Sequence, residues 1–210
     1  MTNERARNPS ATTVESITDP ESLRDRDDVR FTEETAVLDR ETYESVRGQS
    51  EVGDGAALVG ITNDDGEVLL KDTCTGWLPP GGNVAPDGDW AAVARQQAES
   101  WTGVAVELDA IERVRRIDRR LEGADPSETP ALPFHVVYFR ASPAAGEAVA
   151  GDSAPDGSDD SASGESDDSA SDDGDGPDEN DEDAPEVQWF GEVPEGVDQN
   201  HEDDVGVFFG

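Results

Sequence analysis

The chain has one cysteine, Cys74, and one lysine, Lys71, among its 210 residues. A single cysteine excludes an internal disulfide, and with it the class of small secreted proteins that depend on disulfide frameworks. Long apolar runs are also missing: none approaches the roughly 20 residues that a membrane-spanning helix needs, and the first 30 residues contain no signal-peptide-like apolar stretch. We therefore expect a soluble, cytoplasmic protein that does not engage membranes.

Negative charge dominates the composition. The chain has 51 Asp and Glu residues against 15 Lys and Arg, which gives a formal net charge of −36. Such a chain repels itself unless salt screens it, and the Debye length falls to about 3 Å at 1 M salt. With lysine so scarce, this predicts a protein of a salt-rich cytoplasm; an acidic protein in ordinary salt is the alternative. The charge also disfavours nucleic acid as a partner, because nucleic acid is a polyanion.

Composition divides the chain into three parts. Residues 1–28 are polar without a sustained period, so we expect a flexible N-terminal arm. Residues 151–184 contain 15 acidic residues and no Lys, Arg, aromatic or β-branched residue. Such a segment buries too little apolar surface to offset the entropy of ordering. We expect a disordered acidic insertion, a solvated spacer or alternatively a binder of basic partners or cations. Residues 29–150 and 185–210 would form the folded domain.

Within the domain, strand patterns outnumber helical ones. Two apolar runs, Ala56–Thr62 and Glu67–Lys71, flank Asn63-Asp64-Asp65-Gly66, which predicts a β-hairpin because Asp-Gly favours positive φ. A short helix should follow Asp39 and stop at Gly48. Further strands are expected at Val104–Leu108, Ile111–Leu121, Leu132–Arg140 and Val187–Phe190. The pattern predicts an α+β fold with a mixed β-sheet packed between helices.

The stretch WLPPGGNVAPDGDWAAVARQQAESWTGV, which begins at Trp77, combines a glycine turn with a capped helix. Gly81 and Gly82 would let a phosphate or metal approach the main chain. Asp89 is the expected N-cap of a helix over Trp90–Trp101, and Gly103 is its expected stop. The residues that fall at helical spacing, and so form the expected buried face, are Ala91, Ala94, Ala98 and Trp101.

This stretch resembles the Nudix box of the Nudix hydrolases, whose pattern is Gly, five residues, Glu, seven residues, Arg-Glu, a hydrophobic residue, any residue, Glu-Glu, any residue, Gly and a hydrophobic residue. Aligned without gaps, Gly82 takes the first glycine, Ala98 the internal hydrophobic position and Gly103-Val104 the last pair. The resemblance covers about residues 50–210, apart from the acidic tract. It implies a Nudix-like fold that cleaves a nucleoside diphosphate linked to another moiety, with Mg²⁺ or Mn²⁺ as cofactor.

The departures from the pattern fall on the residues that hold the metal in that family. Gln96-Gln97 replaces Arg-Glu, Ser100-Trp101 replaces Glu-Glu, and Gly88 stands at the early Glu. Positions 97, 100 and 101 share one helical face, which here offers an amide, a hydroxyl and an indole, whereas Mg²⁺ prefers carboxylate oxygen. Glu99 points about 200° away around the helix. The candidate replacement ligands are Asp87 and Asp89 in the loop, with Glu107 and Asp118 as further alternatives.

Five of the 14 arginines gather between Arg113 and Arg120. On a strand, Arg113 and Arg115 would share one face and could bind phosphate through their guanidinium groups. The alternative is that the cluster neutralises the protein's own carboxylates. His135 is expected to be structural, and His201 carries no pattern. The predicted substrate-binding residues are Gly81, Gly82, Trp101, Arg113 and Arg115. Core packing is the expected role of Trp101, and the alternative is that it lines the pocket and stacks a base.

Three functions remain open at this stage. The first is a Nudix-like binding module for a nucleotide or a small phosphorylated metabolite, which the neutral face of Gln97, Ser100 and Trp101 favours. The second is a metal-dependent Nudix hydrolase with nonstandard ligands. The third is an interaction protein that acts through its acidic tract. The sequence names neither the ligand nor the oligomeric state.

Overall fold

The computed structural model describes residues 13–50, 53–73, 76–103, 105–144, 187–197 and 201–209. The expected acidic insertion at 151–184 and Cys74 lie outside the described residues. The elements are η1 (Pro20–Leu23), β1 (Arg30–Leu38), α1 (Arg40–Ser50), β2 (Gly55–Thr62), β3 (Val68–Thr73), β4 (Gly76–Leu78), β5 (Gly81–Val84), α2 (Trp90–Thr102), β6 (Val106–Leu121), β7 (Leu132–Pro143), β8 (Val187–Phe190), α3 (Glu202–Gly206) and η2 (Val207–Phe209).

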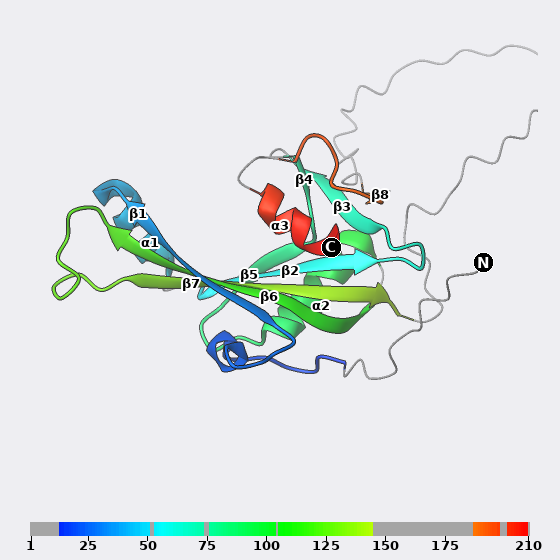
Figure 1. The fold of residues 1–210 in the computed structure, drawn as a ribbon, viewed down its shortest axis with the longest axis horizontal. Helices are drawn as coiled ribbons and strands as arrows, with labels where there is room; N and C mark the ends of the chain where they lie inside the picture. Colours follow the sequence, from blue (N-terminus) through cyan, green and yellow to red (C-terminus); the bar gives the residue numbers. More distant parts are fainter. Residues whose placement is uncertain are drawn as a thin grey trace, which may run out of the picture.

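One mixed sheet of eight strands organises the fold (Figure 1). The strand order is β1-β6-β7-β2-β3-β4, and β5 and β8 pair with β2 and β3 off this path. The pairs β1–β6 and β2–β7 are parallel, and the other pairs are antiparallel. Strand β2 changes partner along its length, since Gly55–Leu58 pairs with β5 and Ile61–Thr62 pairs with β3. The sheet therefore branches at the middle of β2, where the chain passes from β4 to β5.

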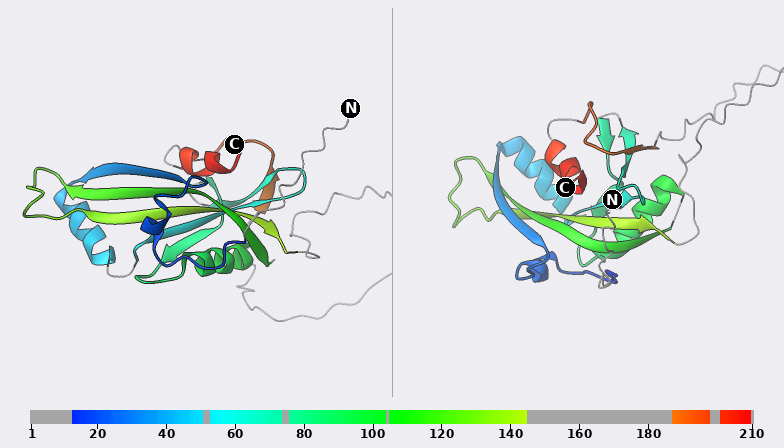
Figure 2. Two further views of the ribbon diagram at one scale, coloured as in Figure 1. Left: turned by 60° about the horizontal axis from the view of Figure 1, so that its bottom comes forward. Right: turned by 45° about the vertical axis from the view of Figure 1, so that its right-hand side comes forward.

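Alternate side chains of the strands build two hydrophobic cores, one on each face of the sheet. Ala57, Val59 and Ile61 of β2 belong to the core beneath α2, which we call the α2 face. The second core contains Tyr138 of β7 together with Val205 of α3 and Phe208 of η2, and we call this side the α3 face. The two helices lie on opposite sides of the strands (Figure 2, left). The α+β fold with a mixed sheet between helices is confirmed, and no helix in the described ranges is long and apolar enough to cross a membrane.

Helix α2 begins at Trp90 as predicted and ends at Thr102, one residue beyond the predicted Trp101 and directly before the predicted stop at Gly103. The Asp89 side chain accepts hydrogen bonds from the amides of Ala91 at 3.0 Å and Ala92 at 3.3 Å, and Gly103 ends the helix in the left-handed region with φ 73°. Ala91, Ala94 and Ala98 are buried as predicted. Trp101 is only half-buried, and Thr102, four residues after Ala98, is buried in its place. The expected buried face was therefore wrong at this one position, and the indole is turned out of the α2 core.

The predicted hairpin is confirmed as β2 and β3. Asn63 Oδ1 accepts hydrogen bonds from the amides of Asp65 at 3.1 Å and Glu67 at 2.9 Å. Gly66 has φ 82°, the left-handed conformation for which Asp-Gly was the signal. The turn is thus held by its own residues, which explains why the local sequence sufficed to find it.

Residues 13–28 are packed against the sheet, which differs from the flexible arm expected through residue 28. Ile17 and Leu23 are buried in the α2 core. The Ile17 amide donates to Asp89 Oδ1 at 3.1 Å, and the Trp90 amide donates to the Ile17 carbonyl at 2.8 Å. The first turn of α2 is therefore tied to this segment. Isolated apolar residues in a polar stretch show no period, so no sequence pattern indicated this packing.

Three element boundaries also differ from expectation. Strand β1 was not anticipated, α1 continues through Gly48 to Ser50, and the two strands expected around Ile111 are one long strand, β6. Register shifts between Leu108 and Ala110 and between Ile111 and Arg113 interrupt its pairing with β7. These irregularities break the alternation of side chains, which made one strand look like two.

Candidate functional site

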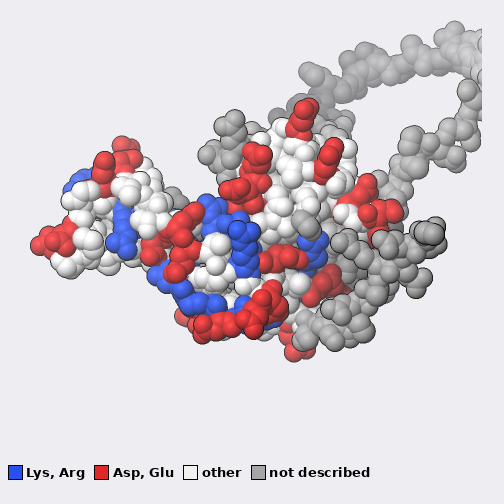
Figure 3. Space-filling view, viewed as in Figure 1, with Lys and Arg blue, Asp and Glu red and all other residues white. Residues whose placement is uncertain are grey.

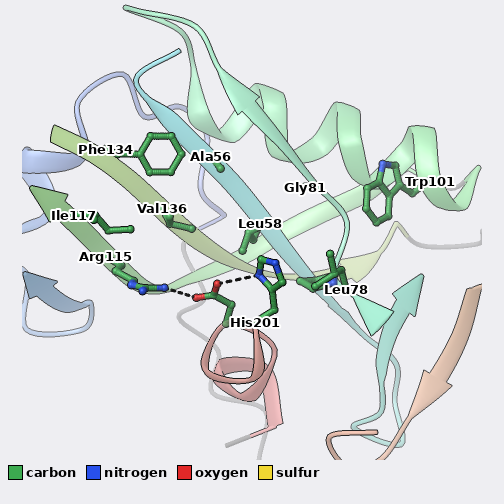
Figure 4. Close-up of a pocket in the computed structure, with 12 residues that line it drawn as sticks. Ala56, Leu58, Leu78, Gly81, Trp101, Arg115, Ile117, Phe134, Val136 and His201 are labelled. Atoms are coloured by element: carbon green, nitrogen blue, oxygen red, sulfur yellow. Dashed lines mark hydrogen bonds and ion pairs between the residues drawn. The ribbon is translucent and has the colours of Figure 1, made fainter. Parts of the chain in front are cut away.

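A pocket of about 390 Å³ opens on the α3 face of the sheet. Apolar side chains form most of its wall, and three polar residues, Arg115, His201 and Asp204, lie together on one side (Figure 4). The apolar part comes from Ala56 and Leu58 of β2, Leu78 of β4, Ile117 of β6, and Phe134 and Val136 of β7. The pocket therefore occupies the branch of the sheet, where β4 and β5 separate.

Of the predicted substrate-binding residues, Gly81, Trp101 and Arg115 line this pocket, whereas Gly82 and Arg113 are not among its lining residues. The glycines also serve packing. A Cβ on Gly81 would lie 2.9 Å from the Ala57 carbonyl oxygen, and one on Gly82 would lie 2.8 Å from Gln97 Cγ. Such contacts are too close for carbon, so these glycines let β5 approach β2 and α2, which is a structural use of residues that suggested phosphate binding.

The face of α2 that would hold metal in a Nudix box has no carboxylate. Gln97 is half-buried against Gly82, and Ser100 and Gln96 are exposed. Trp101 lines the pocket, and the ammonium of Lys71, which is not a lining residue, lies 4.2 Å from the centroid of its ring. In the parts of the chain that the structure describes, no group of three or more His, Cys, Asp or Glu side chains is placed to hold a metal ion. The donor set at this face does not fit Mg²⁺ or Mn²⁺.

The proposed replacement ligands have other surroundings. Asp89 Oδ1 receives the amides of Ile17, Ala91 and Ala92. Burial raises the pKa of Asp89, but these amides and the Ser16 hydroxyl outweigh it, so that the pKa lies below its ordinary value. Asp89 is thus a helix cap tied to the N-terminal segment. Asp87 is exposed in the preceding turn with φ 59°.

The remaining acidic candidates are also engaged or remote. Asp118 Oδ1 accepts a hydrogen bond from Arg116 at 3.0 Å. Glu99 and Glu107 are exposed. None of these three residues lines the pocket.

Four arginines of the cluster on β6 are of two kinds, and the fifth, Arg120, is exposed. Arg115 forms ion pairs with Glu34 at 2.7 Å and Asp204 at 3.0 Å, and Arg116 pairs with Glu21 and Asp118, each at 3.0 Å. These two arginines neutralise the protein's own carboxylates. On the surface, basic side chains form a band among acidic ones, over the region where β1 and β6 lie (Figure 3).

The other kind of arginine stacks on aromatic rings. The Arg113 guanidinium lies 5.6 Å from the centroid of Tyr138, and that of Arg119 lies 3.9 Å from the centroid of Phe134. Burial lowers the pKa of Arg119. Within the described ranges, neither arginine has an ion pair with a carboxylate.

Asp204 is the polar centre of the pocket, and the sequence analysis missed it. It is 8% exposed, and its Oδ1 accepts hydrogen bonds from the Tyr138 hydroxyl and from Arg115 Nη1 at 3.0 Å. Burial raises the pKa of Tyr138, and the neighbouring carboxylate raises it further. Asp204 is one acid among several in an acidic segment. The available signal was Val205 and Phe208, whose helical spacing places Asp204 beside a buried face.

The two histidines lie on opposite faces of the sheet. His135 Nε2 contacts Glu21 Oε1 at 2.8 Å, and its ring packs edge-to-face on Trp90 at 6.4 Å, under the α2 face. His201 lines the pocket, and its Nδ1 lies 3.7 Å from Asp204 Oδ2. His201, for which the sequence showed no pattern, is thus the histidine that lines the pocket.

No family model and no curated protein matches the sequence. Among solved structures, the fold is similar to a UDP-X diphosphatase, at 16% identity and a TM-score of 0.29, over 52% of this chain and 53% of that one. It is also similar to the Ap4A hydrolase of C. elegans, at 18% identity and a TM-score of 0.27, over 43% and 67%. The chain thus spans about half the length of the first of these, and likeness at this level assigns neither residues nor activity.

Proposed function

We propose that the chain is a Nudix-like domain that binds a nucleotide or a related phosphorylated metabolite and does not hydrolyse it with a metal. The observation that supports this most directly is the contrast between the pocket and the helical face beside it. The pocket, at about 390 Å³, is of the size that holds small ligands, whereas the face of Gln97, Ser100 and Trp101 offers no anionic oxygen.

The pocket wall suits a planar ring with a charged tail. Leu58, Ile117 and Val136 would cover the faces and edges of a heterocycle, and the Trp101 indole would stack on it. Lys71 is not a lining residue, but its ammonium lies 4.2 Å from the centroid of the Trp101 ring and adds a positive charge beside that side chain. A phosphate group of the ligand would meet Lys71 there, while Arg115 is already engaged by Glu34 and Asp204.

Hydrolysis of a diphosphate would need groups that this site lacks. A metal ion in such enzymes neutralises phosphate charge and activates water. Gln97 and Ser100 are neutral, and neutral ligands hold Mg²⁺ weakly. The second candidate function is metal-dependent hydrolysis with nonstandard ligands. It is favoured by the ordered likeness of residues 77–104 to the Nudix box and by the exposed carboxylate of Asp87.

We further propose that the protein is adapted to a salt-rich cytoplasm. Outside the tract 151–184, 36 acidic residues remain against 15 basic ones, so the rest of the chain keeps a net charge of −21. Self-repulsion of this size is relieved when the Debye length is short. Functional assays should therefore be run in molar KCl.

The test is a binding and turnover screen on the full chain in molar KCl. Calorimetry would use ADP, UDP, UDP-glucose and diadenosine tetraphosphate as probes, each with Mg²⁺ and with EDTA, and chromatography would follow hydrolysis. We expect saturable binding that EDTA does not abolish and no turnover above background. Trp101→Leu should weaken binding at least tenfold. Trp77→Phe is the matched control, because Trp77 packs on Phe190 at 4.8 Å and is not a pocket residue.

Two outcomes would contradict the proposal. If none of the probes binds, the domain is not a nucleotide-binding module. If the unmodified protein shows Mg²⁺-dependent turnover that Asp87→Ala abolishes, the loop carboxylate has taken over the metal and the second candidate function is correct.

A further inference from the structure

The two carboxylate oxygens of Asp204 have different partners. Oδ1 accepts from both Tyr138 and Arg115. Oδ2 lies 3.7 Å from His201 Nδ1, which is within ion-pair range but beyond hydrogen-bond distance. The carboxylate therefore keeps an acceptor available within the pocket, beside the ring of His201 (Figure 4).

Two donors and a packed helix fix the direction of this acceptor. Tyr138 and Arg115 come from neighbouring strands of the sheet, and Arg115 is itself held by Glu34 at 2.7 Å. Val205, the next residue in α3, is fully buried. Asp204 consequently cannot turn Oδ2 toward bulk water without breaking both bonds to Oδ1, and a bound ligand would meet an oriented acceptor rather than a mobile one.

The surroundings of Oδ2 determine which donor would be accepted. Leu58, Ile117 and Val136 are apolar walls of the same pocket. A sugar would bring several hydroxyl groups to a site with one open carboxylate oxygen, and the hydroxyls left without partners would lose their water. A heterocycle with one exocyclic amino group fits both the apolar walls and the single acceptor, because its ring is apolar and its N–H points along one edge.

We propose that Asp204 Oδ2 is a specificity determinant that accepts a hydrogen bond from the amino group of a nucleobase. This inference rests on the proposed function, since it concerns the same pocket. A base without a donor at that edge would leave a desolvated carboxylate oxygen unpaired, which is a large penalty in an apolar site. A base with a carbonyl oxygen at that edge would in addition be repelled by the negative charge. The pocket would thus select amino-substituted bases.

The experiment compares two ligands that differ only in the amino group: AMP and purine riboside 5′-monophosphate. Calorimetry on the full chain in molar KCl should show that AMP binds about tenfold more tightly or better, the usual effect of leaving a charged acceptor unpaired. In Asp204→Asn the ratio of the two affinities should fall to about one, because the amide turns an N–H toward the pocket when its oxygen accepts from Tyr138 and Arg115.

Two further variants separate recognition from stability. Tyr138→Phe removes a donor to Oδ1 but keeps Oδ2, and His201→Ala removes only the ring facing Oδ2; both should retain the preference for AMP. A purely structural Asp204 would lower both affinities in Asp204→Asn and leave the ratio unchanged, which would overturn the inference. Equal binding of the two ligands by the unmodified protein would overturn it while leaving the proposed function intact. Failure of every nucleotide to bind would remove both.

Discussion

The two faces of the sheet use charge in opposite ways. On the α2 face, the centre of the core is apolar, and the cluster of Glu21, Arg116 and His135 lies at its margin under η1. On the α3 face, Asp204 and Arg115 lie in the wall of the pocket itself. A charge kept in an apolar cavity costs free energy and adds little stability even when it is paired. The difference therefore favours the α3 face as the side that would bind the proposed ligand.

The contrast between the two faces also shows what most residues of the Nudix-like stretch, which begins at Trp77, do in this fold. Its alanines and glycines bring α2 and β5 close to β2, so most of the residues that carry the resemblance do packing on the α2 face. The groups able to recognise a ligand come instead from β6, β7 and α3, which are far apart in the sequence. Four residues of the stretch also line the pocket: Leu78, Pro79, Gly81 and Trp101. Of these, only Trp101 comes from the box helix α2.

The largest effect should follow from placing a charge in the α2 face. Ala94 is fully buried against the sheet, so Ala94→Glu would bury an unpaired carboxylate and overfill the contact. We expect a loss of more than about 4 kcal/mol in the free energy of unfolding, enough to prevent folding. Circular dichroism in molar KCl checks this, with Ala92→Glu on the exposed side of the same helix as the control. A folded Ala94→Glu protein would show that the α2 face tolerates charge after all.

A second prediction asks whether the neutral face of α2 can be made to hold metal. Gln97→Glu, Ser100→Glu and Trp101→Glu together should bring the Kd for Mn²⁺ below about 1 mM, a gain of at least about 1.4 kcal/mol over the unmodified protein. Single substitutions should give little, since ligands of one site act as a unit. The control is Ala92→Glu with Gln96→Glu. Together with Glu99, these two new carboxylates make a row of three on the solvent side of the helix. Equal Mn²⁺ binding by the control would show nonspecific attraction to an acidic helix.

The features that were predicted correctly from the sequence are stabilised by residues close to one another in the chain. Asn63 caps the hairpin turn two and four residues away, and Asp89 caps α2 within three residues. Strand β1 was missed because it pairs in parallel with β6 about 80 residues later, and its Glu33 and Glu34 look solvated until Arg24 and Arg115 are brought beside them. The pocket was only half predicted for the same reason: Trp101 belongs to a motif, whereas the role of Asp204 depends on tertiary contacts alone.

A smaller effect concerns the charged cluster at the margin of the α2 face. Partial burial raises the pKa of Glu21, but hydrogen bonds from His135 and Arg24 and the charge of Arg116 hold it at about 2, below its ordinary 4.5. A lowered carboxyl pKa stabilises the fold above pH 4.5, and this contribution is lost as the pH falls toward 2. Because Glu21 is about a third exposed, solvent screening reduces the stabilisation to about 1 kcal/mol.

Glu21→Gln should therefore lower the free energy of unfolding by about 1 kcal/mol at pH 7 and make no difference near pH 2. Urea titrations across this range measure it. Glu33→Gln is the control, since Glu33 shares the Arg24 partner but is more exposed and does not contact His135; its effect should be smaller at every pH. A constant difference between Glu21→Gln and the unmodified protein from pH 7 to pH 2 would mean that Glu21 acts through packing rather than charge.

The smallest effect on stability should come from Lys71, where the two faces meet at Trp101. Its ammonium lies 4.2 Å from the centre of the indole, and a cation–π contact that is not fully desolvated contributes about 0.5–1 kcal/mol. Lys71→Met keeps the apolar stem, so the thermal midpoint should fall by only a few degrees.

The effect of Lys71→Met on ligand binding should be larger. ADP should bind several-fold more weakly, while adenosine, which carries no phosphate, should bind as before. Lys71→Arg should keep ADP binding. If Lys71→Met weakens ADP and adenosine equally, the lysine only positions Trp101, and the phosphate must instead lie toward Arg113 and Arg119, the two arginines of the pocket-side strand face that stack on rings.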